Sequence, residues 1–243
     1  PYIFQHHDHH AYHYGKDSDI YKQNREAMEK SIFSLVPARY LVNYFELPNV
    51  YYFSHGVNVD TLKPNDTIPI QHSLLMLANN GLGGYGSYDR KGFELGVKVA
   101  MASNLPITIA GPKNNENWFN DNSWVFGYPK LSIITEPANK QLRQLYNSHT
   151  IFLHPSELEA GHPNLTLLEA AACGLPILGW IEEETTFNGL WRAPRDLNLL
   201  IQGLGTIINE YDQYRQNAIS TAQELSWLNR SKELIQLYER LAN

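Results

Sequence analysis

Two glutamates, separated by a polar loop, are the residues of this chain best suited to bind a ligand. Glu159 and Glu169 stand ten positions apart, with Gly161 and Pro163 between them, and the helix expected after the loop ends near Cys173. Hydroxyl groups donate strong hydrogen bonds to carboxylates, and phosphate binds the unpaired N–H groups of a helix start. The segment therefore suits a ligand that carries hydroxyls beside an anion, and a nucleotide sugar has both parts. The alternative is that Glu169 is an ordinary exposed position of a helix.

A glycine-rich loop over residues 79–92 could contact phosphate. Its glycines would let the backbone approach a ligand closely. Arg90 and Lys91, at the expected helix start, would add positive charge. The order Gly-Lys-Ser/Thr of a Walker loop is absent, and the glycine spacing differs from that of a dinucleotide-binding fingerprint. A surface loop before an amphipathic helix explains the same pattern, so two interpretations stay open.

A histidine-rich segment, Gln5-His-His-Asp-His-His10 with His13 close behind, could ligate a transition metal. On a strand, His7 and His9 would share one face. Neighbouring ligands on one short stretch rarely build a closed site, however, and no second cluster in the sequence would complete it. We therefore predict no metal site, and we expect a single histidine at the end of a strand to face a cleft.

Strands and helices alternate in the sequence pattern from residue 73 onward. Continuous apolar runs predict strands, and apolar positions at helical spacing predict helices. The strands are expected at 74–78, 107–110, 131–134, 151–153 and 177–180, and the helices at 91–102, 138–146 and 166–173. Such alternation favours a parallel sheet with right-handed crossovers. Ligands bind such sheets at the loops after the carboxyl ends of strands, which here are residues 79–89, 111–113 and 154–163.

The two ends of the chain carry further elements. Residues 1–5 and 50–53 are strand-like, and residues 6–13 are expected to form a loop. A helix capped by Asp17 or Ser18 is expected to run to about Phe33. Residues 40–45 fit a helix or a strand equally well. The tail, residues 196–242, is expected to form two or three consecutive amphipathic helices.

Composition narrows the functional classes. The chain has 243 residues, enough for one large or two small domains, and 43% of them are hydrophobic. Its formal net charge of −6 argues against a broad nucleic-acid-binding surface. Cys173 is the sole cysteine, which excludes an intrachain disulfide, and we predict a cytoplasmic location. No run approaches the ~20 apolar residues of a membrane span, so no transmembrane segment is expected.

Several segments, taken in chain order, resemble one enzyme family. A His-Asp pair at residues 7–8 follows a strand, and His55-Gly-Val-Asn-Val-Asp-Thr-Leu-Lys-Pro64 matches an inter-domain linker. Arg90-Lys-Gly92 and Ile107-Thr-Ile-Ala-Gly111 match a lysine-glycine helix start and the strand after it. Pro155-Ser-Glu-Leu-Glu159 with Glu169-Ala-Ala-Ala-Cys-Gly-Leu-Pro176 matches the last signature. Together they resemble the retaining GT-B glycosyltransferases of the glycogen-synthase and sucrose-synthase type, called glycosyltransferase family four. The resemblance covers nearly the whole chain.

The resemblance implies an α/β fold of the GT-B type. A Rossmann-like, doubly wound parallel sheet would bind the donor, and a remnant of the N-terminal Rossmann-like domain would precede it. Residues 1–48 would end the acceptor-side domain, 49–66 would be the linker, 67–225 the nucleotide-sugar-binding domain, and 226–243 a helix crossing back. About 48 residues ahead of the linker are fewer than the ~100–150 of an ordinary domain. We therefore expect most of the N-terminal domain to be missing and the remnant to pack on the C-terminal domain.

The resemblance also implies a reaction, in which a hexose moves from a UDP- or GDP-linked sugar to an acceptor hydroxyl with retention of configuration. The acceptor could be a saccharide, a lipid-linked glycan or a protein, and no cofactor or obligatory metal is expected. His7 and Glu159 would act at the sugar, Arg90 and Lys91 would neutralise the diphosphate, and Glu169 would hold the ribose. The loop and helix start would lay backbone N–H groups against sugar and phosphate, through Gly161, His162, Asn164, Leu165 and Thr166.

Two departures from the family pattern leave alternatives open. The signature glutamates are eight positions apart in the family and ten apart here, so Glu157 competes with Glu159 for the first position. Tyr85 stands where the family has an arginine, and Arg90 is the candidate substitute. The alternative function is a non-catalytic nucleotide-sugar-binding module, or a truncated glycosyltransferase fragment that needs a partner segment. A metal hydrolase built on the histidine cluster is a weaker third.

Overall fold

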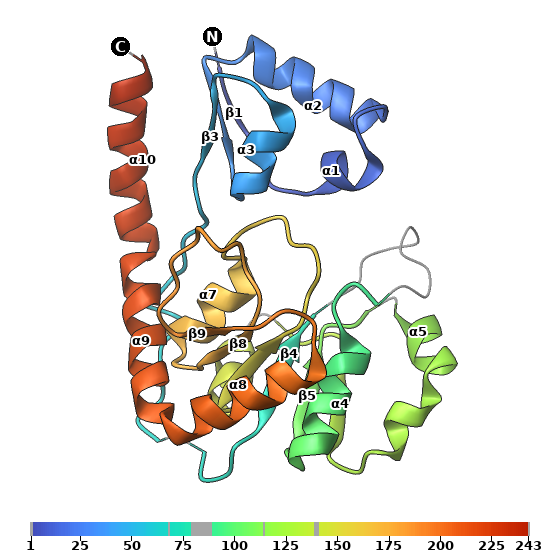
Figure 1. The fold of residues 1–243 in the computed structure, drawn as a ribbon. Coiled ribbons are helices and arrows are strands. Elements are labelled where there is room, and N and C mark those ends of the chain that lie inside the picture. The colour runs from blue at the N-terminus through green and yellow to red at the C-terminus, as the bar shows by residue number, and fades with distance from the viewer. Residues whose placement is uncertain (1, 68, 79–88, 114, 139–140, 243) are drawn as a thin grey trace.

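The computed structural model describes residues 2–67, 69–78, 89–113, 115–138 and 141–242. Within these ranges the chain forms two parallel sheets (Figure 1). The small sheet has the order β1-β2-β3, with β1 at Ile3–Gln5, β2 at Phe33–Val36 and β3 at Val50–Tyr52. The large sheet has the order β6-β5-β4-β7-β8-β9. Its strands are β4 Leu74–Leu77, β5 Ile107–Ala110, β6 Leu131–Ile134, β7 Ile151–His154, β8 Ile177–Gly179 and β9 Leu190–Arg192.

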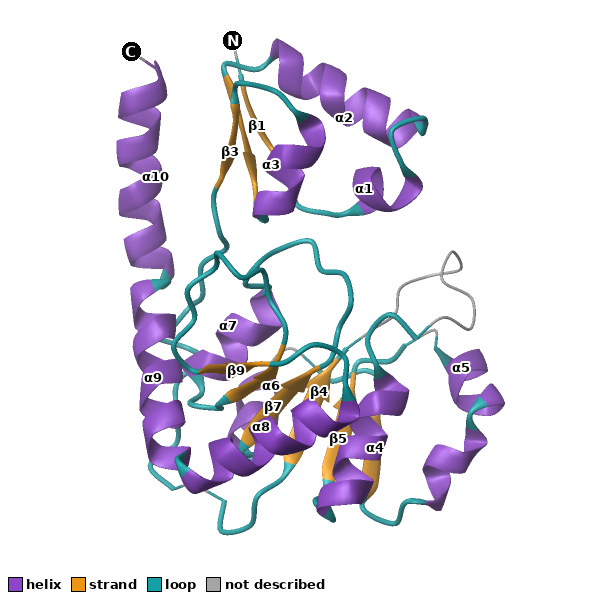
Figure 2. Ribbon diagram, viewed as in Figure 1, coloured by secondary structure: helices purple, strands orange, loops and turns teal. Residues whose placement is uncertain are grey.

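Helices connect the strands of both sheets (Figure 2). The small sheet carries α1 (His10–Tyr14), α2 (Asp19–Lys30) and α3 (Arg39–Phe45). The helices of the large sheet are α4 (Phe93–Ser103), α5 (Glu116–Asp121) with a 3₁₀ turn after it (Ser123–Gly127), α6 (Leu142–Asn147), α7 (Leu165–Ala172), α8 (Leu197–Asn209) and α9 (Tyr211–Glu224). The chain continues into α10 (Trp227–Ala242).

The large sheet has a hydrophobic core on each face, which confirms the doubly wound architecture. α4 and α8 pack on one face, around Phe93 and Leu204. α6, α7 and α9 pack on the other face, around Tyr146 and Leu168. Successive residues of a strand point to opposite faces, so within β7 both Ile151 and Leu153 enter the first core while Phe152 enters the second. A strand buried on both faces explains the continuous apolar runs in the sequence.

Most elements predicted for the large sheet form within a few residues of their expected bounds, and the tail forms three helices, α8 to α10. α5 and β9 were not predicted. β9 has three residues, Leu190-Trp-Arg192, at the edge of the sheet, which is too short for a recognisable apolar run. The whole glycine-rich loop before Asp89, including Tyr85, lies outside the described residues.

The small sheet corrects two predictions. Residues 10–14 form the helix α1 rather than a loop, and just ahead of it Asp8 Oδ1 accepts a hydrogen bond from the His10 N–H at 2.9 Å. α2 begins after its N-cap Ser18 but ends at Lys30, not near Phe33, because Ser31 bonds back to the Met28 carbonyl and β2 follows. Residues 40–45, which the pattern left undecided, belong to the helix α3.

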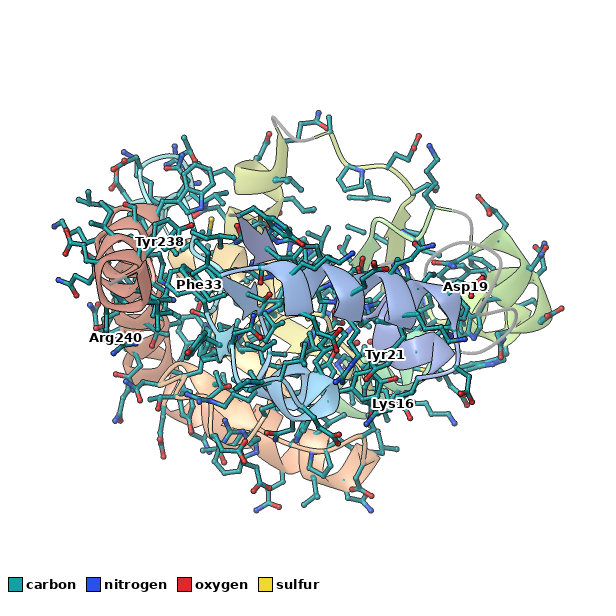
Figure 3. The ribbon with its side chains drawn as sticks, turned by 90° about the horizontal axis from the view of Figure 1, so that it is seen from above. Lys16, Asp19, Tyr21, Phe33, Tyr238 and Arg240 are labelled. Carbon is teal, nitrogen blue, oxygen red and sulfur yellow. The ribbon has the colours of Figure 1, made fainter. Side chains whose placement is uncertain are left out.

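The C-terminal helix α10 runs alongside the small sheet (Figure 1). The centre of its Tyr238 ring lies 5.4 Å from that of Phe33 on β2, and Figure 3 shows the two side chains next to each other. Val36 of the same strand joins the core beneath α2 and α3. Since Phe33 and Val36 point to opposite faces of a strand, α10 covers the face of the small sheet that its own helices leave open. The expected domain boundaries stay a prediction.

Candidate functional site

A short turn brings two cations to the rim of the large sheet. The Asp89 carboxylate accepts hydrogen bonds from the N–H groups of Gly92, Phe93 and Glu94 at 2.8–2.9 Å, so it caps α4. Gly92 has a φ of +77°, and a Cβ there would lie 2.6 Å from the carbonyl oxygen of Pro155. The turn therefore needs glycine, and it presses Arg90 and Lys91 against the loop that follows β7.

Arg90 and Lys91 meet Glu159 in a buried charge cluster. The Lys91 Nζ donates to Glu159 Oε1, and these side chains are 11% and 12% exposed. Arg90 Nη1 lies 3.8 Å from the same oxygen and also donates to the Leu158 carbonyl. Burial raises the pKa of Glu159, but the positive charges around it, first that of Lys91 and then that of Arg90, outweigh burial and hold that pKa well below its usual value. Glu159 is therefore a carboxylate with cations already in place.

His154, the last residue of β7, completes the cluster as a neutral group. Its Nε2 lies 3.8 Å from Glu159 Oε1. Burial lowers the pKa of His154 to about 4, against the opposing attraction of Glu159. Ser156 donates a further hydrogen bond to Glu159 Oε1. The cluster thus gathers residues from the loops after β4 and β7, which are neighbours in the sheet.

The small sheet closes over this cluster through α3. Glu182, after β8, accepts hydrogen bonds from the N–H groups of Arg39 at 3.0 Å and Tyr40 at 2.7 Å. Tyr40 in turn donates its hydroxyl to the Glu159 carbonyl at 2.9 Å. These contacts join residues more than a hundred positions apart, and they fix the first turn of α3 over the rim.

The charges of the cluster act on His9, and the role expected for His7 stays a prediction. Burial, together with the positive charges of Arg90 and Lys91, lowers the pKa of His9 to about 4. His7 is exposed, and its ring stacks on that of His55 with centres 6.3 Å apart. The sequence pattern placed His7 and His9 on one face of a strand, and the family resemblance pointed to His7. Asp8, which bonds the His10 N–H, was the signal that a helix begins here, with His9 as the residue before it.

The second signature carboxylate, Glu169 on α7, has a different partner. The Tyr146 hydroxyl donates to Glu169 Oε2 at 2.8 Å. Burial raises the pKa of Glu169, and the hydrogen bond from Tyr146 opposes that rise. Asn164 caps α7 by accepting the Leu167 N–H at 3.0 Å, and its amide lies 3.4 Å from His154 Nε2. The start of α7 thus lies next to the charge cluster, with Glu169 one turn further on.

The comparisons with known proteins fit this arrangement. The family model described as "Glycosyl transferases group 1" matches residues 86–210, which is just over half of the chain. The chain belongs to this family. The matched segment includes the turn at Asp89, Lys91, both signature glutamates and α8. Among curated proteins, none matches this glycosyltransferase.

Solved structures share the GT-B fold of the glycosyltransferase. Sucrose-phosphate synthase from Thermosynechococcus elongatus matches with a TM-score of 0.76 and 16% identity, over 98% of this chain and 67% of that one. Anabaena HepE in complex with UDP matches with a TM-score of 0.78 and 11% identity, over 99% of this chain and 72% of that one. HepE in complex with UDP and glucose matches with a TM-score of 0.74 and 12% identity, over 100% of this chain and 72% of that one. At these identities the likeness is one of fold.

The geometry of the glycosyltransferase separates the two candidates for the first signature glutamate. Glu159 lies in the cluster with Lys91. Glu157 is half-exposed and pairs with Arg195 at 2.8 Å, outside the cluster. The two-residue expansion of the loop therefore leaves Glu159, and not Glu157, against the cations.

The loop between the glutamates holds the two sheets together. A Cβ on Gly161 would lie 2.6 Å from His55 Cδ2, so a larger residue would require the His55 ring of the linker to shift. His162 is 2% exposed; its N–H donates to the Pro37 carbonyl at 3.0 Å, and its carbonyl accepts from the Tyr52 hydroxyl at 2.6 Å. The backbone N–H of His162, which was expected to face a ligand, bonds the Pro37 carbonyl after β2 in this structure; its role toward a ligand stays a prediction. Leu165 and Thr166 lie in the first turn of α7, where N–H groups lack helical partners.

Neither a metal centre nor a membrane span is found in the described residues. Within those ranges no group of three or more His, Cys, Asp or Glu side chains is arranged to hold a metal ion. None of the helices found there has the length and apolar character needed to cross a membrane.

Proposed function

We propose that this chain binds a UDP- or GDP-linked sugar at the rim of the large sheet and transfers its hexose to an acceptor hydroxyl with retention of configuration. The observation that carries the proposal is the meeting of Lys91 and Arg90 with Glu159 where the loops after β4 and β7 converge. Membership of the glycosyltransferase family supports it. The HepE structures, which hold UDP or UDP and glucose, supply the donor class by analogy.

In this proposal the diphosphate is held mainly by side-chain cations. The first N–H groups of α4 already bond Asp89, so they cannot bind phosphate as well. Lys91 and Arg90 would turn from Glu159 to the diphosphate, aided by the first N–H groups of α7 at Leu165 and Thr166. As the bond to the sugar breaks, negative charge grows on the departing phosphate oxygen, and cations fixed at that place stabilise it.

The released Glu159 carboxylate would then accept hydrogen bonds from the donor sugar. An ionised carboxylate at this position would accept charge-assisted hydrogen bonds from sugar hydroxyls. Glu169, oriented by Tyr146, would accept from the ribose hydroxyls. The acceptor hydroxyl would attack the face from which the phosphate departs, and His7 and His9 would line the sugar from the small sheet. Neutral His9 can bond a hydroxyl without adding positive charge.

Calorimetric titration with UDP, GDP and uridine tests the proposal. One diphosphate nucleotide should bind well, and uridine far more weakly, because uridine lacks the phosphates that Lys91 and Arg90 would bind. Absence of binding by both UDP and GDP would overturn the proposal.

A second candidate follows from the shares of the relatives that the chain covers, 67% of the sucrose-phosphate synthase chain and 72% of the HepE chain. A nucleotide-sugar-binding module that acts together with another segment would bind UDP without consuming a donor. Release of UDP from UDP-glucose, measured in a coupled assay with full-length protein, separates the two: turnover favours the transferase, and binding without turnover favours the module.

A further inference from the structure

At the end of β7, a buried histidine faces a carboxylate with a nitrogen that carries no proton. His154 is 5% exposed, and its Nε2 lies 3.8 Å from Glu159 Oε1. The amide of Asn164 fixes where the protons are. Its Oδ1 accepts from the Leu167 N–H and from the Thr166 hydroxyl, both at 3.0 Å, so its NH₂ group is the one that faces His154 Nε2, at 3.4 Å. An amide NH₂ group only donates, and Nε2 therefore accepts.

Two hydrogen-bond acceptors, His154 Nε2 and Glu159 Oε1, thus face each other in the interior. A proton on Nε2 would turn them into an imidazolium and a carboxylate, which form a charge-assisted hydrogen bond. In the structure other groups satisfy the carboxylate, because Lys91 Nζ donates to the same oxygen and Arg90 Nη1 lies 3.8 Å from it. The carboxylate has no need of the histidine while these cations stay in place.

The charges around the ring keep the proton away. Two cations, Lys91 and Arg90, and one carboxylate, Glu159, leave a surplus of positive charge beside His154. His162 also acts on the ring, and burial lowers its own pKa. Burial lowers the pKa of His154 to about 4, with the positive charges of the cluster acting in the same direction and Glu159 opposing them. His154 is therefore neutral near pH 7.

A bound donor would reverse the sign of this surplus. In the proposed function Lys91 and Arg90 turn to the diphosphate of a nucleotide sugar, whose phosphates each carry a negative charge. The surplus beside His154 then changes from positive to negative, and Glu159 loses the hydrogen bond from Lys91. Both changes favour a proton on Nε2, because nearby negative charge stabilises the charged form of histidine.

We propose that His154 takes up a proton when the donor binds and, as an imidazolium, takes the place of Lys91 beside Glu159. The inference rests on the proposed function. The proton comes from solvent, and no covalent bond of the donor changes in this step. His154 is then a positioning residue, which keeps the Glu159 carboxylate paired and directed at the sugar while the two cations hold the diphosphate.

The pH dependence of donor binding follows from this uptake. The complex holds more protons than the free protein, so the donor should bind more tightly as the pH falls. The bound histidine should titrate at or above its ordinary pKa of about 6.5. The affinity for the donor should therefore rise about fourfold or more between about pH 8 and about pH 6.

Calorimetry in several buffers tests the inference by counting protons. UDP-glucose and GDP-mannose are titrated into the protein at about pH 6.5, in buffers of different ionisation enthalpy, and the slope of the observed heat against that enthalpy gives the protons taken up. The donor that binds should bring about half a proton or more into the complex. Neither probe has the terminal phosphate group, titrating near pH 6, that would itself exchange protons with the buffer.

Two histidine variants separate the proposed role from a structural one. His154→Gln keeps a polar side chain beside Glu159 but cannot take up a proton, so it should lose the uptake and the rise in affinity at low pH. His149→Gln is the matched control. His149 stands just before β7, at the other end of the strand, its pKa is also lowered by burial, and it bonds Thr108 and the Leu145 carbonyl. This variant should take up as many protons as the parent.

His9 is the rival histidine, because its pKa also responds to Arg90 and Lys91. His9→Gln should keep most of the uptake, since the carboxylate that needs the proton lies beside His154. Uptake that is lost in His9→Gln and kept in His154→Gln would overturn the inference.

The remaining outcomes separate this inference from the proposed function. A parent that binds a donor without proton uptake, or a His154→Gln variant with unchanged uptake, contradicts the inference and leaves the proposed function standing. If His154→Gln does not fold, nitrogen NMR of the parent decides, with the His154 ring identified by its stacking on Phe152. Its Nε2 signal should move to the imidazolium position when the donor is added, and a signal that stays refutes the uptake. A parent that binds neither donor, nor UDP, nor GDP refutes both proposals together.

Discussion

The two signature carboxylates lie in opposite electrostatic surroundings. Glu159 shares one oxygen with Lys91, has Arg90 and His154 close by, and has a pKa well below its usual value. Glu169 bonds a neutral tyrosine hydroxyl, and burial raises its pKa. In the proposed function, the first carboxylate would exchange these partners for a ligand. The second is a positioned hydrogen-bond acceptor, so the two should respond differently to mutation and to pH.

The largest effect should come from breaking the charge cluster. Glu159→Ala leaves Lys91 and Arg90 buried without their carboxylate, which should lower the free energy of unfolding by about 3–5 kcal/mol. Glu157→Ala removes the half-exposed partner of Arg195 and should cost at most about 1 kcal/mol. Urea unfolding of both variants measures the difference. Equal losses would show that the two glutamates are not in different surroundings.

The next effect concerns the nucleotide. Lys91→Ala should weaken UDP binding about 10- to 100-fold, the range expected for a lost charged hydrogen bond, and should leave uridine binding unchanged. Lys98→Ala removes an exposed lysine of α4 that pairs with Glu94, and it should bind UDP like the parent. Calorimetry with both ligands gives the answer. A parallel loss for uridine would mean that Lys91 supports the fold and not the diphosphate.

The pH dependence of stability should differ in sign between the two surroundings. The pKa of His154 is lowered by burial to about 4, so the unfolded state binds more protons between pH 4 and 6.5, and stability falls as pH falls through this window. His154→Gln should remove about 1–3 kcal/mol of that fall. Glu169 has a raised pKa, so its folded form gains a proton first and gains stability as pH falls.

Glu169→Gln should therefore steepen the acid loss that His154→Gln flattens. Urea unfolding at a series of pH values between 4 and 7 measures both slopes. Slopes that change in the same direction in the two variants would contradict the contrast.

The smallest effect is expected for Asn164, the N-cap of α7, which stands between the two glutamates in the sequence. Asn164→Ala should cost about 1 kcal/mol of stability, as should Asp196→Ala, which removes the equivalent cap of α8. UDP binding should weaken in Asn164→Ala alone, because α7 begins beside the charge cluster and α8 does not. Thermal unfolding and calorimetry on the same samples measure both effects. Unchanged UDP binding in Asn164→Ala would show that the cap of α7 has no influence on the ligand.

The large sheet could be predicted from the sequence because strands that are buried on both faces require continuous runs of apolar residues. β2 could not, since Phe33-Ser-Leu-Val36 follows a helical pattern and its burial depends on Tyr238, about two hundred residues later. The rim was predictable for the same reason as the strands, because parallel topology puts the loops after β4 and β7 together. His9 and Glu182 were not, because their roles come from contacts between the two sheets, such as the bond from Arg39 to Glu182 across 143 positions.

The linker residue Val57 has a mechanical consequence. Its N–H bonds the Leu225 carbonyl at 3.0 Å and its carbonyl accepts the Trp227 N–H at 2.9 Å, so it bridges the junction of α9 and α10. Two passages of the chain between the sheets therefore meet at one point, on the side of the molecule away from α4 (Figure 1). We expect the small sheet to rotate about this point as about a hinge. The contact between Tyr40 and Glu159 would then open, and a donor could enter while the cores of both sheets stay intact.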